Sequence, residues 1–305
     1  MVMSFVTFMF IQMAPGDILA PYRLNPQISE ETIAEMEQKF HFDKHPLVQY
    51  LFWLKNLVRL DLGYSFSKRA PVASVIGSYL VNTLILAAFS IFITWVVAIP
   101  VGIYCAVNQY RWSDRIFSFL AYIGMSTPNF FLALLLLYAV SVMGILPIGG
   151  MKSVNFDELS VIGKTLDVLK HLVVPGIVLG TAAMASLQRI MRGNMLEELR
   201  ARYVTTARAK GLPENRVVYL HALRNAINPL ITIFGYQFSA LLSGAALTEI
   251  ITSWPGLGSV MLEAVRAQDL FLVMGNMLMG GVMLICGNLL ADLLLAWSDP
   301  RISLS

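Results

Sequence analysis

Long apolar blocks are the feature that most constrains how this chain can fold. A helix needs about 20 mostly apolar residues to cross the roughly 30 Å hydrocarbon layer of a bilayer. Four blocks reach that length, namely Tyr79–Val107, Ile116–Val142, Ala226–Ile251 and Leu270–Trp297. Only 13% of the 305 residues are charged, against about 25% in a soluble domain. The pattern predicts an all-α integral membrane protein.

Two shorter apolar segments bring the prediction to six spans. Leu172–Leu187 can be extended by its flanking residues, whereas Met1–Ala14 is too short to cross alone at about 1.5 Å per residue. A signal peptide is the alternative for residues 1–14, but no basic residue leads them and no small-residue cleavage site precedes Pro15. We interpret residues 1–14 as part of a first span whose beginning is missing or that starts late.

Basic residues predict which side of the membrane each loop occupies. Between the fourth and fifth spans lie Arg189, Arg192, Arg200, Arg202, Arg208, Lys210, Arg216 and Arg224. By the positive-inside rule, this loop is predicted to be cytoplasmic, together with Arg111 and Arg115 after the second span and Arg301 in the tail. The long segment 15–77 then lies outside.

The outer segment 15–77 contains two predicted helices. Ser29 is a good helix cap, and Glu30 and Glu31 suit a first helical turn. The first helix would bury Ile33, Met36 and Phe40. A second helix would open at Pro46 and present an inner face of Tyr50, Leu54, Leu57 and Val58. Such a segment is either a folded cap or a docking surface for an external binding protein.

Within the basic loop, residues 195–210 have helical periodicity. One face would carry Leu196, Leu199, Tyr203 and Ala207. Gly211 can take the left-handed conformation that ends a helix. Pro213 can open a second helix, which would run through Val217, Leu220 and Leu223 toward Pro229. This helix–break–helix pattern suits a rigid element that fits a cleft on a partner; a solvated basic helix that only obeys the positive-inside rule is the alternative.

The residues of this loop are similar to a known segment. Residues 203–212 (YVTTARAKGL), with 221–226 (HALRNA) and Pro229, resemble the coupling segment of ABC-importer permeases, in the version found in the B-type subunit of dipeptide, oligopeptide and nickel importers. The general family motif has a Glu-Ala-Ala triplet before a glycine. Thr205-Thr206-Ala207 holds the triplet position and Gly211 the glycine, so the glutamate is absent, as is usual for the peptide branch.

The resemblance extends over nearly the whole chain, in the same order. Further similar segments are 14–17 (APGD), 60–66 (LDLGYSF), 126–131 (STPNFF), 248–258 (TEIITSWPGLG) and 299–302 (DPRI). It implies a type I, MetI-like ABC permease fold, divided into a partial first span 1–14, an outer insertion 15–77, a membrane domain 78–298 with a coupling segment 192–229, and a tail 299–305.

The resemblance also implies partners and coupling residues. A homologous second permease, two cytoplasmic ATPases that bind ATP and Mg²⁺, and an external binding protein would complete a peptide importer, and this chain would hold no cofactor of its own. The residues expected to engage the ATPases are Glu197, Arg202, Tyr203, Thr205, Thr206, Ala207, Arg208, Lys210, Gly211, His221 and Arg224. A nickel or other small-solute importer of the same branch is the alternative.

Nothing in the sequence predicts catalysis by the chain itself. Gly163-Lys164-Thr165 resembles the end of a P-loop, but Glu158 occupies the position of the required first glycine. The histidines His171 and His221 stand apart, so no metal site is predicted. A stand-alone secondary transporter is the alternative from another class, but neither paired intramembrane charges nor an inverted repeat is visible.

Polar residues inside the spans are candidates for the translocation path, because they usually face a bundle interior or a water-filled route. The selected candidates are Asn82, Asn129, Gln237 and Ser243. Hydrogen bonding between helices is the competing explanation for such residues.

Overall fold

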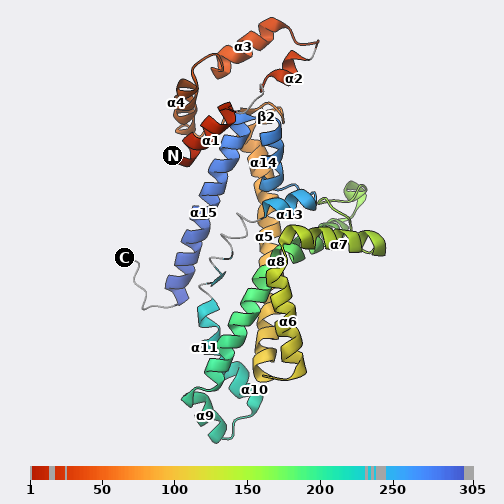
Figure 1. Cartoon of the computed structure of the whole chain (residues 1–305), viewed down its shortest axis with the longest axis vertical. Helices are drawn as coiled ribbons and strands as arrows, with labels where there is room; N and C mark the ends of the chain where they lie inside the picture. The colour runs from red at the N-terminus through yellow and green to blue at the C-terminus, as the bar shows by residue number, and fades with distance from the viewer. Residues whose placement is uncertain are drawn as a thin grey trace. The chain divides into compact units, whose positions relative to one another are not determined.

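The computed structural model describes residues 2–13, 18–24, 26–230, 233–234, 237 and 245–298. Helices dominate the described residues, and the strands in them, β1 (Tyr64–Ser65) and β2 (Ala70–Pro71), form one short antiparallel pair (Figure 1). Internal contacts divide the chain into two compact units. The first unit comprises residues 1–82 and 255–282, and the second comprises residues 83–254 and 283–305.

The first unit contains the short helices that precede the long apolar blocks. They are α1 (Val2–Met13), α2 (Ala20–Arg23), α3 (Glu30–Phe40) and α4 (Pro46–Leu57), joined later in the chain by α14 (Leu257–Arg266). The predicted helix starts are confirmed, because the Ser29 hydroxyl accepts a hydrogen bond from the Thr32 amide and Pro46 opens α4. Helix α3 buries Ile33, with Met36 and Phe40 packed beside it.

Helix α4 packs against α1 within the first unit. The Gln12 side-chain amide donates to Gln49 at 2.8 Å, and the hydroxyls of Ser4 and Tyr50 lie 2.9 Å apart. The inner face of α4 was predicted to include Val58, which is wrong because Val58 is 87% exposed. Val58 lies outside the helix, which ends at Leu57. The buried aromatic residues of α4 are Tyr50 and Trp53.

Within the first unit, the Asp269 carboxylate joins residues 65–67 to the start of the last long helix. Its carboxylate accepts hydrogen bonds from the Ser65 hydroxyl at 2.7 Å and from the amide and hydroxyl of Ser67 at 2.9 and 2.8 Å. The same carboxylate accepts from the Leu272 amide at 3.2 Å, at the start of α15 (Leu270–Ser298). A fully buried charge is tolerated here because several donors satisfy it.

The second unit is built on two long helices, α5 (Val72–Val107), whose first turns lie in the first unit, and α8 (Val161–Leu199). Helix α8 has 39 residues, far more than the predicted span Leu172–Leu187. It extends past the apolar core in both directions, since Ser160 caps its start and its last turns carry charged residues. The turn η1 (Phe156–Glu158) precedes it, and α13 (Ala246–Ile251) packs in the same unit.

The predicted span Ile116–Val142 is two helices rather than one. Helix α6 (Trp112–Ser126) and helix α7 (Asn129–Met143) meet at an angle of 109°. The bend lies at Thr127-Pro128. Proline restricts the preceding residue to extended backbone, and Thr127 has φ −87° and ψ 121°.

Three described helices are long and apolar enough to cross a membrane, namely Val72–Val107, Val161–Leu199 and Leu270–Leu290. The bent α6–α7 pair would count as a fourth if it is a single broken span, and α1 is a shorter apolar helix. The predicted span Ala226–Ile251 falls largely outside the described residues. Six spans therefore stay a prediction.

Glycines on each of the two long helices let α5 and α8 approach closely. A Cβ atom at Gly102 of α5 would lie 2.7 Å from the Met191 Cβ and 2.9 Å from the Gln188 carbonyl oxygen of α8. On α8, a Cβ at Gly176 would lie 2.6 Å from Phe89. Small residues of this kind allow helix backbones to pack at short distance in membrane proteins.

Replacing Gly102 with valine should therefore separate the two long helices. Adding bulk to a close-packed contact typically costs about 1–3 kcal/mol of unfolding free energy, which should appear as a lower melting temperature of the detergent-solubilised protein. The matched control is Gly77→Val on the same helix, where an added Cβ meets no atom within 4 Å. Equal melting temperatures for the two variants would contradict the close α5–α8 contact.

Candidate functional site

Residues 200–229, called here the 200–229 segment, fold into short helices after the end of α8. They are α9 (Arg202–Ala209), α10 (Glu214–Arg216), the π-helical turn η2 (Val217–Ala222) and α11 (Leu223–Ala226). The predicted break at Gly211 is confirmed, because its φ of +74° is left-handed backbone that glycine adopts without a Cβ penalty. Pro213 lies just before α10 rather than inside it.

The predicted continuous helix over residues 195–210 is wrong. Helix α8 ends at Leu199, and the extended backbone of Ala201 (φ −64°, ψ 149°) starts α9 in a new direction. Leu196 and Leu199 therefore belong to α8, and Tyr203 is exposed. The buried positions of α9 are Val204 and Ala207. Packing against the rest of the unit, rather than helical periodicity alone, selects this face.

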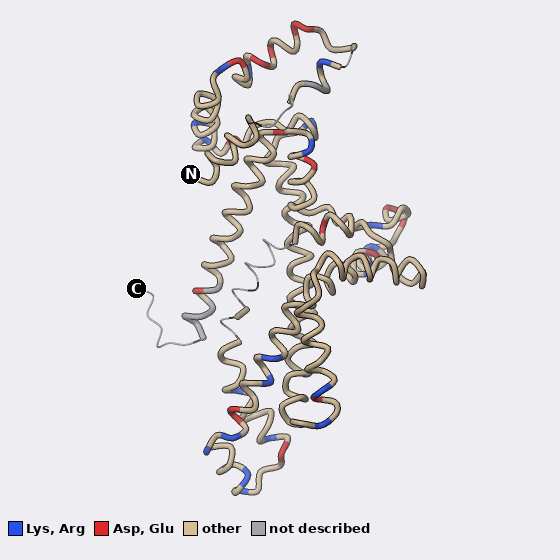
Figure 2. The backbone as a smooth tube through the Cα atoms, in the orientation of Figure 1, with Lys and Arg blue, Asp and Glu red and all other residues tan. Residues whose placement is uncertain are grey.

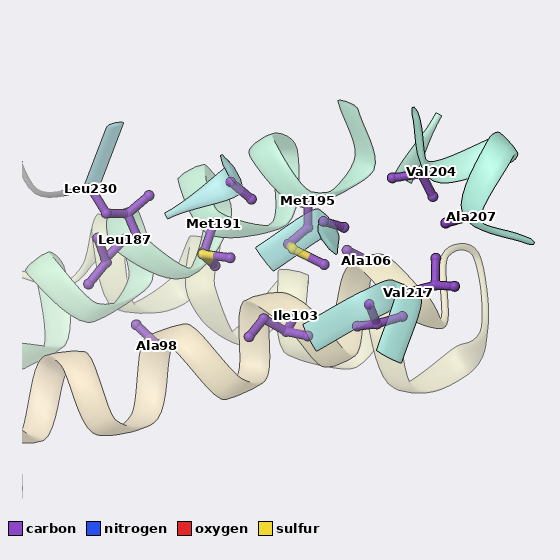
Figure 3. Close-up of a cluster of buried hydrophobic side chains, with 13 residues drawn as sticks. Ala98, Ile103, Ala106, Leu187, Met191, Met195, Val204, Ala207, Val217 and Leu230 are labelled. Carbon is purple, nitrogen blue, oxygen red and sulfur yellow. The ribbon is translucent and has the colours of Figure 1, made fainter. Parts of the chain in front are cut away.

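One apolar cluster joins the 200–229 segment to both long helices of the second unit (Figure 3). Its buried members are Ala98, Ile103 and Ala106 from α5, Leu187, Met191 and Met195 from α8, and Val204, Ala207, Val217, Val218, Ala222, Ala226 and Leu230 from the segment and the residue that follows it. Val204, Val217, Leu187 and Met191 are 0% exposed. Close-packed interiors transmit displacement, because they have few voids and low compressibility.

Arg208 fixes the short helices to one another. Its guanidinium donates to both carboxylate oxygens of Glu214, at 3.1 and 2.6 Å, and to the Leu199 carbonyl at 3.3 Å. These bonds connect the end of α8 with α9 and α10. The adjacent Arg208 guanidinium lowers the pKa of Glu214, so the pair is fully charged at neutral pH.

A second arginine connects α8 with α6. Arg192 makes a bidentate pair with Asp114, with Nε–Oδ1 and Nη2–Oδ2 distances of 2.7 and 2.8 Å. Asp114 is 2% exposed, and it also accepts from the Tyr110 amide at 3.0 Å. The sequence reasoning counted Arg192 only as a loop charge and missed this pair, because nothing local connects residues 78 positions apart.

The outward face of the 200–229 segment is basic, with apolar residues among the charges. Figure 2 shows Lys and Arg gathered around these short helices. The exposed coupling candidates are Glu197, Arg202, Tyr203, Thr205, Thr206, Arg208, Lys210, Gly211 and Arg224. His221 is half-buried and Ala207 is buried. Leu220 is 63% exposed and Tyr219 is 60% exposed, because the buried positions of the π-helical turn are Val217, Val218 and Ala222.

The translocation candidates are not brought together by the described structure. In the first unit, the Asn82 side chain donates to the Pro255 carbonyl at 2.8 Å. In the second unit, Gln237 accepts from the Trp95 indole at 2.8 Å. Asn129 begins α7, and Ser243 lies outside the described residues. Asn82 and Gln237 thus form hydrogen bonds to neighbouring segments. Such bonding is the alternative explanation for polar residues inside the spans.

Glu249 is a buried carboxylate that sequence reasoning overlooked. It is 0% exposed on α13 and accepts a hydrogen bond from the Thr83 hydroxyl of α5 at 2.7 Å. Its position near the end of an apolar block was the available signal. For metals, no group of three or more His, Cys, Asp or Glu side chains with suitable placement occurs among the described residues.

Breaking the Arg208–Glu214 pair should loosen α9 without unfolding the unit. Exposed ion pairs are worth about 0.2–1 kcal/mol, so Glu214→Gln should speed amide hydrogen exchange in residues 202–212 about two- to fivefold at neutral pH. Glu158→Gln, an exposed change elsewhere in the same unit, is the control.

The same pair predicts a pH dependence. Because the pKa of Glu214 lies below its ordinary value of 4.5, its contribution is complete above that value and is lost as pH falls through the lower folded pKa. Exchange of residues 202–212, corrected for intrinsic rates, should accelerate in acid in the wild type but not in Glu214→Gln. Identical acid profiles would contradict the pairing.

Comparisons with known proteins relate the chain to membrane components of transport systems. The model of the family described as "Binding-protein-dependent transport system inner membrane component" matches residues 98–304. The chain is 37% identical to the oligopeptide transport system permease protein AppB of Bacillus subtilis, over 98% of this chain and 93% of that protein. It is 36% identical to the dipeptide transport system permease protein DppB of Escherichia coli K12, with 98% and 93% covered.

A solved structure shares the fold. The inward-facing MetNI methionine ABC transporter matches with a TM-score of 0.52 at 16% identity, over 73% of this chain and 97% of that chain. The expected MetI-like helical fold is thereby confirmed. The family and the similar permeases confirm the expectation of a permease rather than an enzyme. The chain belongs to the family of inner-membrane components of binding-protein-dependent transport systems and is a permease subunit of an ABC importer.

Proposed function

We propose that this permease subunit forms half of the path for dipeptides or oligopeptides, and that its 200–229 segment docks onto cytoplasmic ATPases. The single observation that carries the docking proposal is the apolar cluster that packs α9, η2 and α11 onto α5 and α8. A segment held in this way moves together with the long helices, so a push on its outer surface displaces them.

The outward face of the segment has the composition of a docking surface. Tyr219 and Leu220 are exposed on the same segment as the exposed basic side chains Arg202 and Arg216. Aromatic residues and arginine are enriched at protein interfaces and dominate their binding energy. A solvated helix that only satisfies the positive-inside rule has no need for the exposed tyrosine and leucine.

The partners follow from the family. Its members work with a binding protein, as the family description states. The more specific proposal is a heterodimer with a homologous permease, two ATPases that hold ATP and Mg²⁺, and an external binding protein. The basic 200–229 segment and the C-terminal tail would be cytoplasmic and residues 15–77 external, in accord with the positive-inside rule.

Peptides are the proposed substrates because the similar permeases are named for oligopeptide and dipeptide transport. In operation, ATP binding would close the ATPases and displace the docked segment. Through the shared cluster, α5 and α8 would move with it and open the path outward, and hydrolysis would reset them. Arg208 and Glu214 would keep the segment rigid during this cycle.

Replacing the exposed pair Tyr219 and Leu220 with alanine should weaken ATPase docking. Removing interface anchors costs about 2 kcal/mol or more, so ATPase retention by the purified complex should fall at least about tenfold. The matched control is Tyr138→Ala with Leu134→Ala on α7, where the side chains are 71% and 54% exposed. Equal ATPase retention in both double variants would exclude this face as the docking surface.

Transport assays test the substrate and the energy source. In proteoliposomes that contain all partner subunits, labelled dipeptide or oligopeptide should accumulate only with ATP and binding protein. The purified chain alone should hydrolyse no ATP. Uptake of nickel ion in place of peptide would assign the other branch of the family, and uptake driven by an ion gradient without ATP would contradict an ABC importer.

A further inference from the structure

A pocket of about 340 Å³ lies within the first unit, among α1, α4 and the start of α15. Its size lies at the lower end of the range of small-molecule sites. Basic and aromatic side chains dominate the lining, which includes Lys39, Lys55, Arg59, Phe52, Trp53 and Phe271. None of its lining residues is among the translocation or coupling candidates.

The positive charge of the pocket is largely uncompensated. Lys39, Lys55 and Arg59 have no ion-pair partner among the described residues, and Asp61 is the one acidic side chain of the lining. Elsewhere in the same unit, cations do have partners, since Arg23 pairs with Glu37 and Lys68 with Glu263. Three unpaired cations around one pocket favour an anionic ligand.

The interior of the pocket is aromatic. Phe8 of α1 and Phe271 of α15 contribute to its wall, and the His41 ring stacks on Phe52 with centroids 4.0 Å apart. Trp53 is 3% exposed, and its indole N–H has no hydrogen-bond partner among the described residues. A buried N–H without a partner is costly, so a ligand that supplied an acceptor would stabilise it.

The pocket is bordered by two apolar helices. Phe8 belongs to the apolar helix α1, and Leu270 and Phe271 are the first residues of a helix long enough to cross a membrane. The two helices that contribute to the pocket also expose apolar side chains, such as Phe10 of α1 and Leu51 of α4. Basic and aromatic side chains next to exposed apolar surface suit the interfacial layer of a bilayer, where headgroups lie.

We propose that this pocket binds the headgroup of an anionic phospholipid. The phosphate would lie among Lys39, Lys55 and Arg59, and the acyl chains would run along the exposed apolar faces of α1 and α4. A soluble anion, such as the carboxylate of an acidic peptide, could use the same cations, but it has no use for the adjoining exposed apolar surface.

Native mass spectrometry of the purified chain, with phosphatidylglycerol and phosphatidylcholine of identical acyl chains, tests the proposal. Lysine and arginine side chains near a bilayer surface attract anionic lipid headgroups. The wild type should therefore prefer phosphatidylglycerol at least about tenfold, and Lys39→Gln/Lys55→Gln/Arg59→Gln should lose most of that preference. The matched control, Arg23→Gln/Lys44→Gln/Arg266→Gln, removes the same charge outside the pocket and should retain it.

Several results would overturn the proposal. These are equal binding of the two lipids by the wild type, equal loss of preference in the two triple variants, or displacement of phosphatidylglycerol by millimolar inorganic phosphate or a free acidic dipeptide. Trp53→Phe provides a milder variant that keeps the ring and removes the N–H. It should weaken phosphatidylglycerol binding severalfold while the melting temperature without lipid stays unchanged, and unaltered lipid binding would exclude a role for the indole.

Discussion

The apolar cluster between the 200–229 segment and the long helices α5 and α8 is the contact on which the proposed function of the second unit depends. Its members are aliphatic side chains and alanines that are almost completely buried. Truncating one large buried aliphatic residue in such a cluster costs about 2–5 kcal/mol. The short helices α9, α10 and α11 are too short to be stable by themselves, so they exist as a structured surface only because this cluster holds them.

Polar contacts fix the orientation of the helices that the apolar cluster holds together. Arg208 joins three successive helices through Glu214 and the Leu199 carbonyl, and Arg192 holds the nearly buried Asp114 of α6. An unpaired charge at the Asp114 position would be expensive, so the pair favours one arrangement of α6 against α8. Movement delivered to the segment can therefore reach α5, α6 and α8 through contacts within a single compact unit.

Sequence patterns predicted the features that depend on local chemistry. The apolar blocks gave the long helices, Ser29 and Pro46 gave two helix starts, and Gly211 gave the break between α9 and α10. The buried faces of the helices were harder to predict, since Val58 and Tyr203 are exposed against expectation. In both cases the chain changes direction at a nearby non-helical residue, which shifts the face that periodicity indicates.

Pairs distant in sequence could not be read from local patterns. The Asp114–Arg192 pair, the bond from Thr83 to Glu249 and the network around Asp269 each join segments separated by many residues. Family resemblance identified the 200–229 segment because its motif is contiguous. It did not reveal that Ala207 is a core residue whereas Thr205 and Thr206 are exposed, although helical periodicity places Ala207 with the apolar residues.

A distance measurement between α9 and α5 tests the rigid attachment most directly. Spin labels at Val107 and Thr206, both exposed, would be placed in a chain with Cys105→Ala and Cys286→Ala, assembled with its partner subunits. Double electron–electron resonance should give the same distance distribution in the nucleotide-free and ATP-bound complexes, because the shared cluster moves α9 and α5 together. A distribution that shifts or splits on ATP binding would show that the segment moves independently of α5 and would contradict transmission through the cluster.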